Sequence, residues 1–419
     1  MFDRDKWQEI FSTLRKNRLR TVLTAFGVSW GILMLVILIG LGNGLKNGVT
    51  GSFNDIATNS VFIWTRQTTI PYKGFPRGRP FWFRNDDRQA LIDNIPEIQI
   101  VAPRIQGWGG QGSNNVIRGL HTGAFTIQGD YPEYNKIDPV DIFEGRHINP
   151  TDIDEKRKVA VIGPRAYDIL FEPGEDPVGQ NIRINGVYFT VVGRFKPLRD
   201  NEMGPDKNEM IIIPFTTLQK VYNYGDIVGH FAITSKEEFP VSLVEEKAKK
   251  VLAERHAIHP DDMDAFGGFN LEEEFRKMKG LFWAIDILLW FVGIGTLLAG
   301  AIGVSNIMLV IVKERTKEIG IRRAIGASPF TVMGQIMSES IILTMLAGLI
   351  GFSLGVWALY GINLGVEGAE DPGMFRNPEI SLNVGIIAIT IMIIAGALAG
   401  FIPARKAVSI KPIDALRYE

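Results

Sequence analysis

Residues 305–328 read SNIMLVIVKERTKEIGIRRAIGAS, and they join an apolar run to a charged one. Glu318 and Arg322 stand one helical turn apart, in the order that stabilises a helix. Gly326 is expected to end that helix, and Ser328-Pro329 has the composition of an N-cap followed by a first-turn proline. The stretch therefore predicts a short charged helix, residues 313–328, between two apolar segments.

Apolar stretches of membrane-spanning length lie on both sides of this charged helix. A membrane helix needs about 20 predominantly apolar residues, and four runs approach or exceed that length: 21–45, 281–312, 329–364 and 384–402. The second would be about 48 Å long as a helix, so we expect it to continue the charged segment 271–279 as a stalk beyond the bilayer. A cleavable signal peptide is the alternative for the first run, but its apolar core is too long and three later runs make the chain polytopic.

Lysine and arginine residues near the ends of these runs predict their orientation. Six precede the first run, five lie in the charged helix and four follow the fourth run, whereas the loop 365–383 holds only Arg376. We therefore expect a multi-pass protein of the cell inner (cytoplasmic) membrane with both termini in the cytoplasm. The expected organisation is a cytoplasmic amphipathic segment 1–20, transmembrane helices 21–45, 281–312, 329–364 and 384–402, a periplasmic α+β domain with stalk 46–280, a cytoplasmic helix 313–328, a periplasmic loop 365–383 and a cytoplasmic tail 403–419.

Residues 46–280 have the pattern of a water-soluble α+β domain. Asn185-Gly186 stands between two β-patterned runs, which is a strong hairpin signal. Residues 86–95 and 241–255 read as helices. The predicted fold class is an α-helical membrane protein with four transmembrane helices plus an α+β extracytoplasmic domain between the first and second. The runs with strand composition are 60–65, 98–102, 159–162, 181–184, 187–192, 210–213 and 231–233.

Three segments of this domain have the composition of binding sites. Residues 256–264 carry two histidines and three aspartates that could hold a metal, although a solvated turn explains them better. Residues 107–112, GWGGQG, look like a phosphate cradle but open no patterned helix, which favours a flexible loop. Residues 71–84 mix arginines with phenylalanines and a tryptophan. A partner-contact or interfacial loop and a loop packed on its own domain are equally open for that segment.

Composition excludes several classes of function. The net charge of −1 gives no basic field for nucleic acid, and the lack of cysteine removes disulfides, thiolate zinc sites and cysteine nucleophiles. No Gly-Lys dipeptide occurs, so ATP binding through a Walker A loop is not expected. We predict no catalytic residue, cofactor or metal. Asp286 is interpreted as the only acidic residue well within an apolar run and as a possible intramembrane polar site, although a place in water near the outer helix end also fits it.

The charged stretch resembles the MacB/FtsX-type ABC transporter permeases, the mechanotransmission or type VII superfamily. The shared pattern is Asn-Ile-Met-x(5)-Glu-Arg-Thr-x-Glu-Ile-Gly-x-Arg-x-Ala-x-Gly-Ala, residues 306–327. PARKA at 403–407 and PIDALRYE at 412–419 are similar to the family's ending, and VAVIG at 159–163 is similar to its MacB-like periplasmic core. The chain lacks the fused N-terminal ATPase of MacB, which implies a stand-alone permease served by a separate ABC ATP-binding subunit.

The resemblance implies a dimeric permease, formed with a second copy or a paralogue, that moves nothing through its own spans. Closure of the ATPase would move the charged helix, and the first two spans would pass that motion to the periplasmic domain. Membrane lipid surrounds such a protein, a periplasmic adaptor and an outer-membrane channel are further candidate partners, and no nucleic acid is expected. The residues implied in ATPase coupling are Lys313, Glu314, Arg315, Thr316, Glu318, Arg322, Arg323 and Gly326.

Other functions remain open at the level of sequence. MacB-like efflux of an antibiotic or peptide is the first expectation, and lipoprotein release or an FtsX-like role in cell division is the alternative within the same superfamily. A membrane-anchored sensor or receptor is the alternative of another class. A sensor normally carries a cytoplasmic output domain, and the expected cytoplasmic segments are too short to form one.

Overall fold

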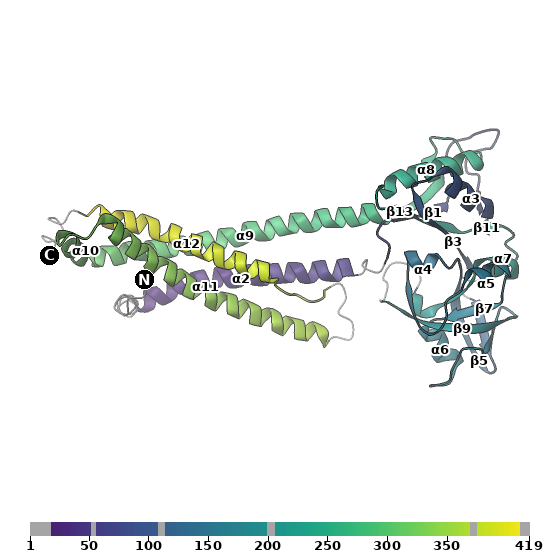
Figure 1. Cartoon of the computed structure of the whole chain (residues 1–419), viewed down its shortest axis with the longest axis horizontal. Helices are drawn as coiled ribbons and strands as arrows, with labels where there is room; N and C mark the ends of the chain where they lie inside the picture. The colour runs from purple at the N-terminus through teal and green to yellow at the C-terminus, as the bar shows by residue number, and fades with distance from the viewer. Residues whose placement is uncertain (1–17, 52–55, 108–113, 199–205, 369–374, 411–419) are drawn as a thin grey trace. The chain divides into compact units, whose positions relative to one another are not determined.

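The computed structural model describes two compact units, one helical and one built on a β-sheet (Figure 1). The helical unit comprises Met1–Gly51 with Gly280–Glu419, and the second unit comprises Ser52–Lys279. The structure describes residues 18–51, 56–107, 114–198, 206–368 and 375–410. Most of the expected N-terminal segment 1–20, the GWGGQG motif after residue 107 and the PIDALRYE ending lie outside these residues.

Four long helices dominate the helical unit, and each is long and apolar enough to cross a membrane. Each contains one of the apolar runs predicted from sequence and extends beyond it in at least one direction. In α12 the helix continues past the predicted end through Pro403, with Arg405 and Lys406 in its last turn, where positive charge suits the helix dipole. The long helices are α2 (Arg18–Gly51), α9 (Leu271–Glu314), α11 (Pro329–Glu367) and α12 (Leu382–Val408), and the short α10 spans Thr316–Ala324.

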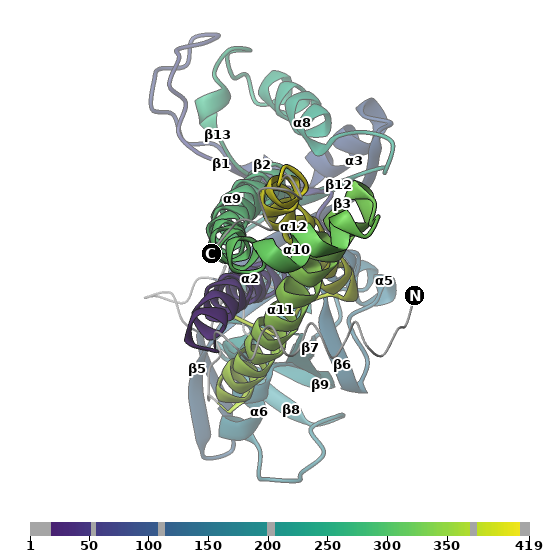
Figure 2. The same ribbon diagram turned by 90° about the vertical axis from the view of Figure 1, so that its left-hand side faces the viewer.

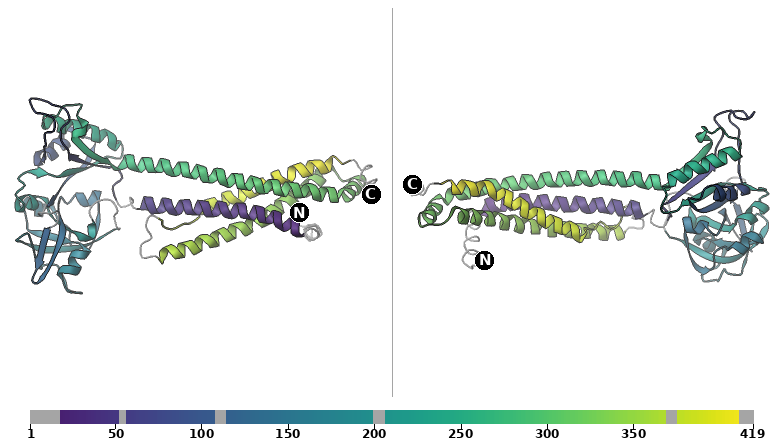
Figure 3. Two further views of the ribbon diagram at one scale, coloured as in Figure 1. Left: turned by 180° about the vertical axis from the view of Figure 1, so that it is seen from behind. Right: turned by 45° about the horizontal axis from the view of Figure 1, so that its top comes forward.

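These helices approach one another through glycines, as Gly-x-x-x-Gly spacing in apolar segments predicts. A Cβ atom added to Gly351 of α11 would clash with the backbone carbonyl of Ser29 in α2. One added to Gly396 of α12 would lie 2.9 Å from the Cα of Ile341 in α11. The two views of Figure 3 show α2, α11 and α12 running side by side. The backbones therefore touch where a larger side chain would hold the helices apart.

The second unit is α+β, as predicted, and its strands form one large mixed sheet. Strands β4, β5, β10, β7, β9 and β8 pair in a closed ring, because β10 pairs with β5 in parallel as well as with β7. Strands β3, β12, β1 and β13 extend the sheet from β5 as an antiparallel arm. The ring strands are β4 (Asn114–Arg118), β5 (His121–Asp130), β7 (Val159–Ile162), β8 (Asn181–Ile184), β9 (Val187–Pro197) and β10 (Met210–Pro214); β6 (Val140–Gly145) pairs with β9; and the arm strands are β1 (Ser60–Thr65), β3 (Ile98–Gly107), β12 (His230–Ser235) and β13 (Phe266–Asn270).

Local sequence signals account for several of these elements. The predicted hairpin joins β8 to β9, and Asn185 and Gly186 both take the positive φ values, 45° and 87°, that a two-residue turn of this kind requires. The predicted helix 241–255 is present as α8 (Val241–Arg255), and the helix predicted at 86–95 is α3 (Asn85–Asn94). The remaining short helices are α4 (Tyr134–Ile137), α5 (Pro150–Asp154), α6 (Pro164–Leu170), α7 (Phe215–Val221), η1 (Lys207–Glu209) and η2 (Met263–Ala265), and β2 (Phe83–Arg84) pairs with β11 (Ile227–Val228) in a small second sheet.

The C-terminal part of the arginine- and aromatic-rich segment 71–84 packs on its own domain, whereas residues 73–78 are exposed. Phe83 is fully buried and Phe81 is 8% exposed, and both rings contact Phe266 at the start of β13. The Arg79 guanidinium donates hydrogen bonds to the carbonyls of His256 (2.5 Å) and Ala257 (3.1 Å). The interpretation as a loop packed on its own domain therefore holds for Arg79, Phe81 and Phe83, and a contact role for the exposed residues 73–78 stays a prediction.

Candidate functional site

The charged stretch forms a compact helical turn between α9 and α11. Helix α9 ends at Glu314, and α10 begins at Thr316, so the helix occupies only the middle of the predicted range 313–328. The Thr316 hydroxyl donates to the carbonyls of Val312 (3.1 Å) and Lys313 (2.8 Å), which provides these carbonyls at the end of α9 with a hydrogen bond. The predicted N-cap is present: the Ser328 side chain accepts a hydrogen bond from the Thr331 amide at the start of α11.

Arginine side chains hold α10 against the neighbouring helices. Arg315 donates to Glu318 (2.9 Å) and to Glu339 of α11 (3.2 Å), whose side chain is only 8% exposed. Arg322 donates to Gln335 of α11 (2.9 Å). Figure 2 looks toward this part of the helical unit, where α10 lies beside α11. Because a buried carboxylate is costly without a cationic partner, the contact between Arg315 and Glu339 fixes α10 on α11.

A third arginine ties α10 to α12. The Arg323 guanidinium donates to the carbonyls of Val408 (2.6 Å) and Ile410 (2.8 Å), where α12 ends. A cation bonded to the terminal carbonyls satisfies groups that the helix itself leaves unpaired. Helix α10 is therefore joined covalently to α9 and by side chains to both α11 and α12.

The remaining surface of this turn is exposed and mixes charge with apolar area. Lys317, Ile321 and Ile325 follow one another at four-residue intervals, so they occupy one face. Ile325 is 82% exposed and Ile321 is 41% exposed, which is unusual for isoleucines beside charged residues. We call this surface the α10 face; it comprises Lys313, Glu314, Lys317, Glu318, Ile321 and Ile325.

The eight residues predicted to couple to an ATPase divide into three groups. Lys313, Glu314 and Glu318 contribute to the exposed surface, whereas Arg315, Arg322 and Arg323 bond to neighbouring helices. Thr316 and Gly326 shape the backbone, Gly326 with a φ of 107°. The sequence predictions did not include the exposed isoleucines or the α11 residues Gln335 and Glu339. Gln335 and Glu339 stand four residues apart shortly after the N-cap, and this spacing could have indicated that both lie on one face of α11.

The interpretation of Asp286 as the only acidic residue within an apolar run is wrong, because Glu339 lies in the third run as well. Glu339 is buried at the start of α11, facing Arg315. Asp286 of α9 lies 3.9 Å from the ammonium group of Lys46 in α2, and both side chains are 47% exposed. Of the two carboxylates, only Glu339 has the enclosed, paired environment that makes an intramembrane acid structurally important.

The histidine and aspartate residues at 256–264 serve separate structural contacts. His256 bonds to the carboxylate of Asp87 (2.7 Å), whereas Asp262 accepts hydrogen bonds from Thr69 and Ile70. His259 packs edge-on against the Tyr72 ring. Within the described parts of the chain, no three His, Cys, Asp or Glu side chains converge closely enough to hold a metal ion.

The sheet unit contains a buried ionic network. Arg104 of β3 makes two hydrogen bonds of 2.6 Å to Asp130 of β5 and lies 3.5 Å from the centre of the Tyr134 ring. His230 of β12 bonds to the Tyr134 hydroxyl (3.3 Å), and burial, together with the nearby Arg104 charge, lowers the pKa of His230 to about 3. His230 is therefore neutral at physiological pH, and the network crosses three strands of the arm and ring.

Taken with the four long helices, these features define a polytopic membrane protein with an α+β domain inserted between its first two long helices. A family model described as the MacB-like periplasmic core domain matches residues 21–251, and one described as the FtsX-like permease C-terminal matches residues 290–412. The chain belongs to the MacB/FtsX-type family of ABC transporter permeases.

Curated relatives agree with this family. The chain is 30% identical to the pyoverdine export ATP-binding/permease protein PvdT of Pseudomonas putida, over 96% of this chain and 58% of that protein. It is 25% identical to the macrolide export ATP-binding/permease protein MacB of Syntrophobacter fumaroxidans, over 97% of this chain and 63% of the relative. The chain thus spans about six-tenths of the length of these relatives.

A solved structure is similar to part of the chain. The crystal structure of the periplasmic region of MacB from Actinobacillus actinomycetemcomitans is matched with a TM-score of 0.43 and 19% sequence identity. The match covers 54% of this chain and 95% of that structure.

Proposed function

We propose that this chain is the permease subunit of an ABC transporter, in which a separate cytoplasmic ATP-binding subunit hydrolyses ATP and docks on the α10 face. The observation that carries the proposal is the exposure of Ile321 and Ile325 among charges of both signs on a helix fixed to three others. Apolar anchors surrounded by charges are typical of the centre and rim of a protein interface. In this proposal the permease itself is not catalytic.

The contacts behind the α10 face support a role in transmitting motion. A force on α10 acts on α9 through the chain, on α11 through Arg315 and Glu339, and on α12 through Arg323. The connection to α9 is covalent, and those to α11 and α12 are direct side-chain hydrogen bonds. Close-packed elements respond to such a force by moving together rather than by deforming, so displacement of α10 is proposed to move the helices as a group.

Helix α9 is the proposed path toward the α+β domain. It runs without a break from Leu271 to Glu314, about 66 Å at 1.5 Å per residue, and β13 directly precedes it in the chain. One uninterrupted hydrogen-bonded helix connects the α10 turn with the sheet. The work is proposed to be done by the domain 46–280 on a substrate that is already outside the membrane.

The proposal also includes the membrane topology of the chain and its partner proteins. The excess of lysine and arginine in three segments supports an inner-membrane protein with both termini cytoplasmic. We propose a dimer with a second copy or a paralogue, assisted by a periplasmic adaptor and an outer-membrane channel. Because the relatives named above are exporters of macrolides and pyoverdine, export of an antibiotic, peptide or similar molecule is the proposed activity.

A charge reversal on the α10 face tests the docking role. We expect Glu314→Lys with Glu318→Lys to abolish co-purification of the ATP-binding subunit with the full-length chain, because two attractive contacts become repulsive. The measurement is the amount of that subunit, identified by its Walker A sequence, and the ATPase activity in the purified complex.

Glu273→Lys with Glu274→Lys is the matched control. It makes the same change in charge at two partly exposed positions near the N-terminal end of α9, where the glutamates pair with Lys277. The control is expected to retain the ATP-binding subunit. Equal retention by both double variants would contradict docking on the α10 face, and ATP hydrolysis by the isolated chain would contradict the proposal as a whole.

A further inference from the structure

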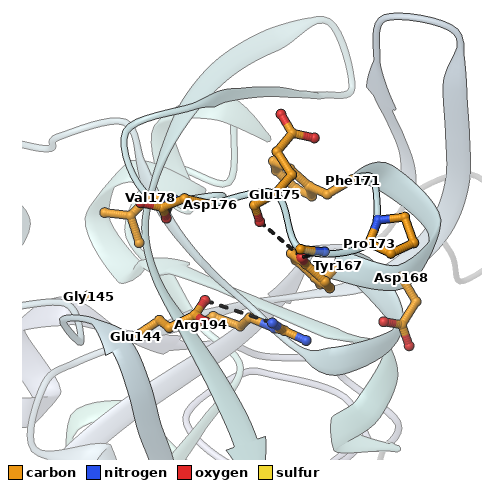
Figure 4. Close-up of a pocket in the computed structure, with 11 residues that line it drawn as sticks. Glu144, Gly145, Tyr167, Asp168, Phe171, Pro173, Glu175, Asp176, Val178 and Arg194 are labelled. Carbon is orange, nitrogen blue, oxygen red and sulfur yellow. Dashed lines mark hydrogen bonds and ion pairs between the residues drawn. The ribbon is translucent and has the colours of Figure 1, made fainter.

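The sheet unit contains a cavity of about 860 Å³ that the proposed coupling function does not use (Figure 4). It lies between α6 and the loop that follows it on one side, and the paired strands β6 and β9 on the other. Cavities of about 300–1,000 Å³ are typical of small-molecule sites. The charged and hydroxyl-bearing residues of its lining are Glu144, Tyr167, Asp168, Glu175, Asp176 and Arg194.

One wall of the cavity is a fixed stack of arginine and aromatic side chains. Arg194 lies 3.5 Å above the Tyr167 ring, and Tyr167 stacks on Phe171 with ring centres 5.7 Å apart and an angle of 9° between the planes. Arg118 lies 4.3 Å above the Phe171 ring. The Tyr167 hydroxyl donates to the carbonyl of Glu175 (2.9 Å), as Figure 4 shows. This wall is therefore organised before any ligand binds.

The charge around the cavity is strongly negative. Four carboxylates line it, those of Glu144, Asp168, Glu175 and Asp176, against the single guanidinium of Arg194. Glu175 pairs with Arg118, and its hydrogen bond with Arg118 lowers the pKa of the Glu175 carboxyl, so this group is ionised. Three carboxylates with one cation between them remain to attract a positively charged ligand.

Two buried polar atoms of residues that line the cavity, Glu144 Oε2 and Arg194 Nε, lack hydrogen-bond partners in the described parts of the chain. Glu144 Oε2 and Arg194 Nη1 lie 3.8 Å apart, an ion pair without a hydrogen bond. An ammonium donor to Glu144, or a carbonyl acceptor for Arg194, would gain a bond after a small side-chain movement without breaking an internal hydrogen bond.

The carboxylates do not form a metal site. No three acidic or histidine side chains in the described ranges converge as ligands of one ion, so the negative charge is distributed along the cavity. A ligand that matches this distribution has cationic groups separated by an apolar or peptide body. The apolar part would lie along Val178 and Pro173, which also line the cavity.

We propose that this cavity binds a peptide-like organic cation, a ligand with two or more ammonium or guanidinium groups and a carbonyl acceptor between them. The cationic groups pair with Asp168, Asp176 and Glu144, and the carbonyl accepts from Arg194. The proposed ligand is a free molecule with this chemistry. The proposal is independent of docking on the α10 face.

The test is equilibrium binding to the full-length chain in detergent, with Lys-Ala-Lys amide as the probe and spermidine as a cation without a peptide body. We expect saturable, salt-sensitive binding of the lysine peptide at a ratio of one per chain. Asp168→Asn with Asp176→Asn should raise its Kd about tenfold, because two exposed charges are lost. Asparagine keeps the acceptor that Asp176 offers to the Val178 amide (2.9 Å), so the loop retains its contact. Glu144→Gln should raise the Kd by a similar factor.

Glu237→Gln with Glu238→Gln is the control, since it removes two exposed carboxylates from the same unit away from the cavity lining. Binding that survives the control but not the cavity variants supports the proposal. Preference for the peptide over spermidine supports the carbonyl contact with Arg194, and spermidine binding as tight as that of the peptide would overturn that contact. The proposal is overturned if wild type shows no saturable binding, if Glu-Ala-Glu amide binds equally well, if the control weakens binding as much, or if Mg²⁺ competes better than Na⁺ at equal ionic strength.

Discussion

The two units of this chain are held together by different physical means. In the sheet unit, large side chains such as Phe125, Phe189 and Phe231 fill a core that also encloses the ion pair of Arg104 with Asp130. In the helical unit, glycines bring backbones into contact, and Gly351 meets the carbonyl of Ser29. Water drives burial of apolar side chains in the first case. Lipid provides no such force, so close packing must stabilise the second.

This difference predicts which kind of substitution destabilises each unit most. Loss of a charge partner should damage the sheet unit most, whereas an added methyl group should damage the helical unit most. Hydrogen exchange of the full-length chain, followed peptide by peptide, reports the local free energy of opening in both units and permits a direct comparison.

The largest effect is expected from Arg104→Met. It leaves the Asp130 carboxylate buried with its two 2.6 Å hydrogen bonds removed, which typically costs about 3–5 kcal/mol. The measurement is exchange protection of β3 and β5. Arg183→Met in β8, at a partly exposed position, is the control and should change protection by less than about 0.5 kcal/mol. Equal effects of the two variants would contradict a special contribution of the buried ion pair to the stability of the sheet unit.

A smaller loss is expected from Gly351→Ala. The new Cβ collides with backbone rather than with a movable side chain, so α2 and α11 must separate at a cost of about 1–3 kcal/mol. Exchange protection of α2 and α11 reports this loss. Gly361→Ala in the same helix adds a methyl group with no atom within 4 Å and should cost nothing. If Gly361→Ala is equally harmful, glycine packing is not what holds these helices.

Asp87→Asn should lower the stability of α3 and α8 by about 1–2 kcal/mol near neutral pH. Burial alone would raise the pKa of the Asp87 carboxyl, but hydrogen bonds from His256 (2.7 Å) and Arg255 (2.6 Å) outweigh it and hold that pKa below its usual range. The stabilisation is therefore complete above the ordinary aspartate pKa and is lost as pH falls through the lower folded value. Exchange protection should decline in acid for wild type and change less for the variant; parallel acid profiles would refute the assignment.

The last comparison, which includes the smallest expected effect, separates two partners of one arginine. Glu318→Gln removes an exposed partner of Arg315, with the glutamate 60% exposed, and should cost less than about 0.5 kcal/mol. Glu339→Gln removes the negative charge of the buried partner of Arg315 and should cost about 1–2 kcal/mol, measured by exchange at the start of α11. If Glu318 proves the more important of the two for folding, the α10 face serves stability rather than docking.

Local patterns explain how much of the structure could be predicted from sequence. Apolar length predicted the four long helices, and Asn185-Gly186 predicted the hairpin, because both signals lie within a few consecutive residues. The parallel pairing of β10 with β5 joins strands about 85 residues apart, and no short pattern encodes it. The same holds for Arg104 with Asp130.

In the candidate sites, too, the local features could be predicted from sequence and the long-range contacts could not. The charged run indicated which segment of the helical unit to consider, but which of its side chains point inward depends on α11 and α12. The cavity depends on Arg194 of strand β9 reaching Tyr167 of helix α6, a contact that the spacing of neither residue reveals. Side chains that act together across elements are visible only once the chain has folded.

The turn between α10 and α11 is already fixed at both ends, by Gly326 with its positive φ and by the N-cap of Ser328. A partner that binds there would order no further backbone. The heat capacity of association should then fall only by the small amount that burial of Ile321 and Ile325 contributes, without the large decrease that accompanies folding upon binding. Calorimetry at several temperatures would record an association enthalpy that changes little between them.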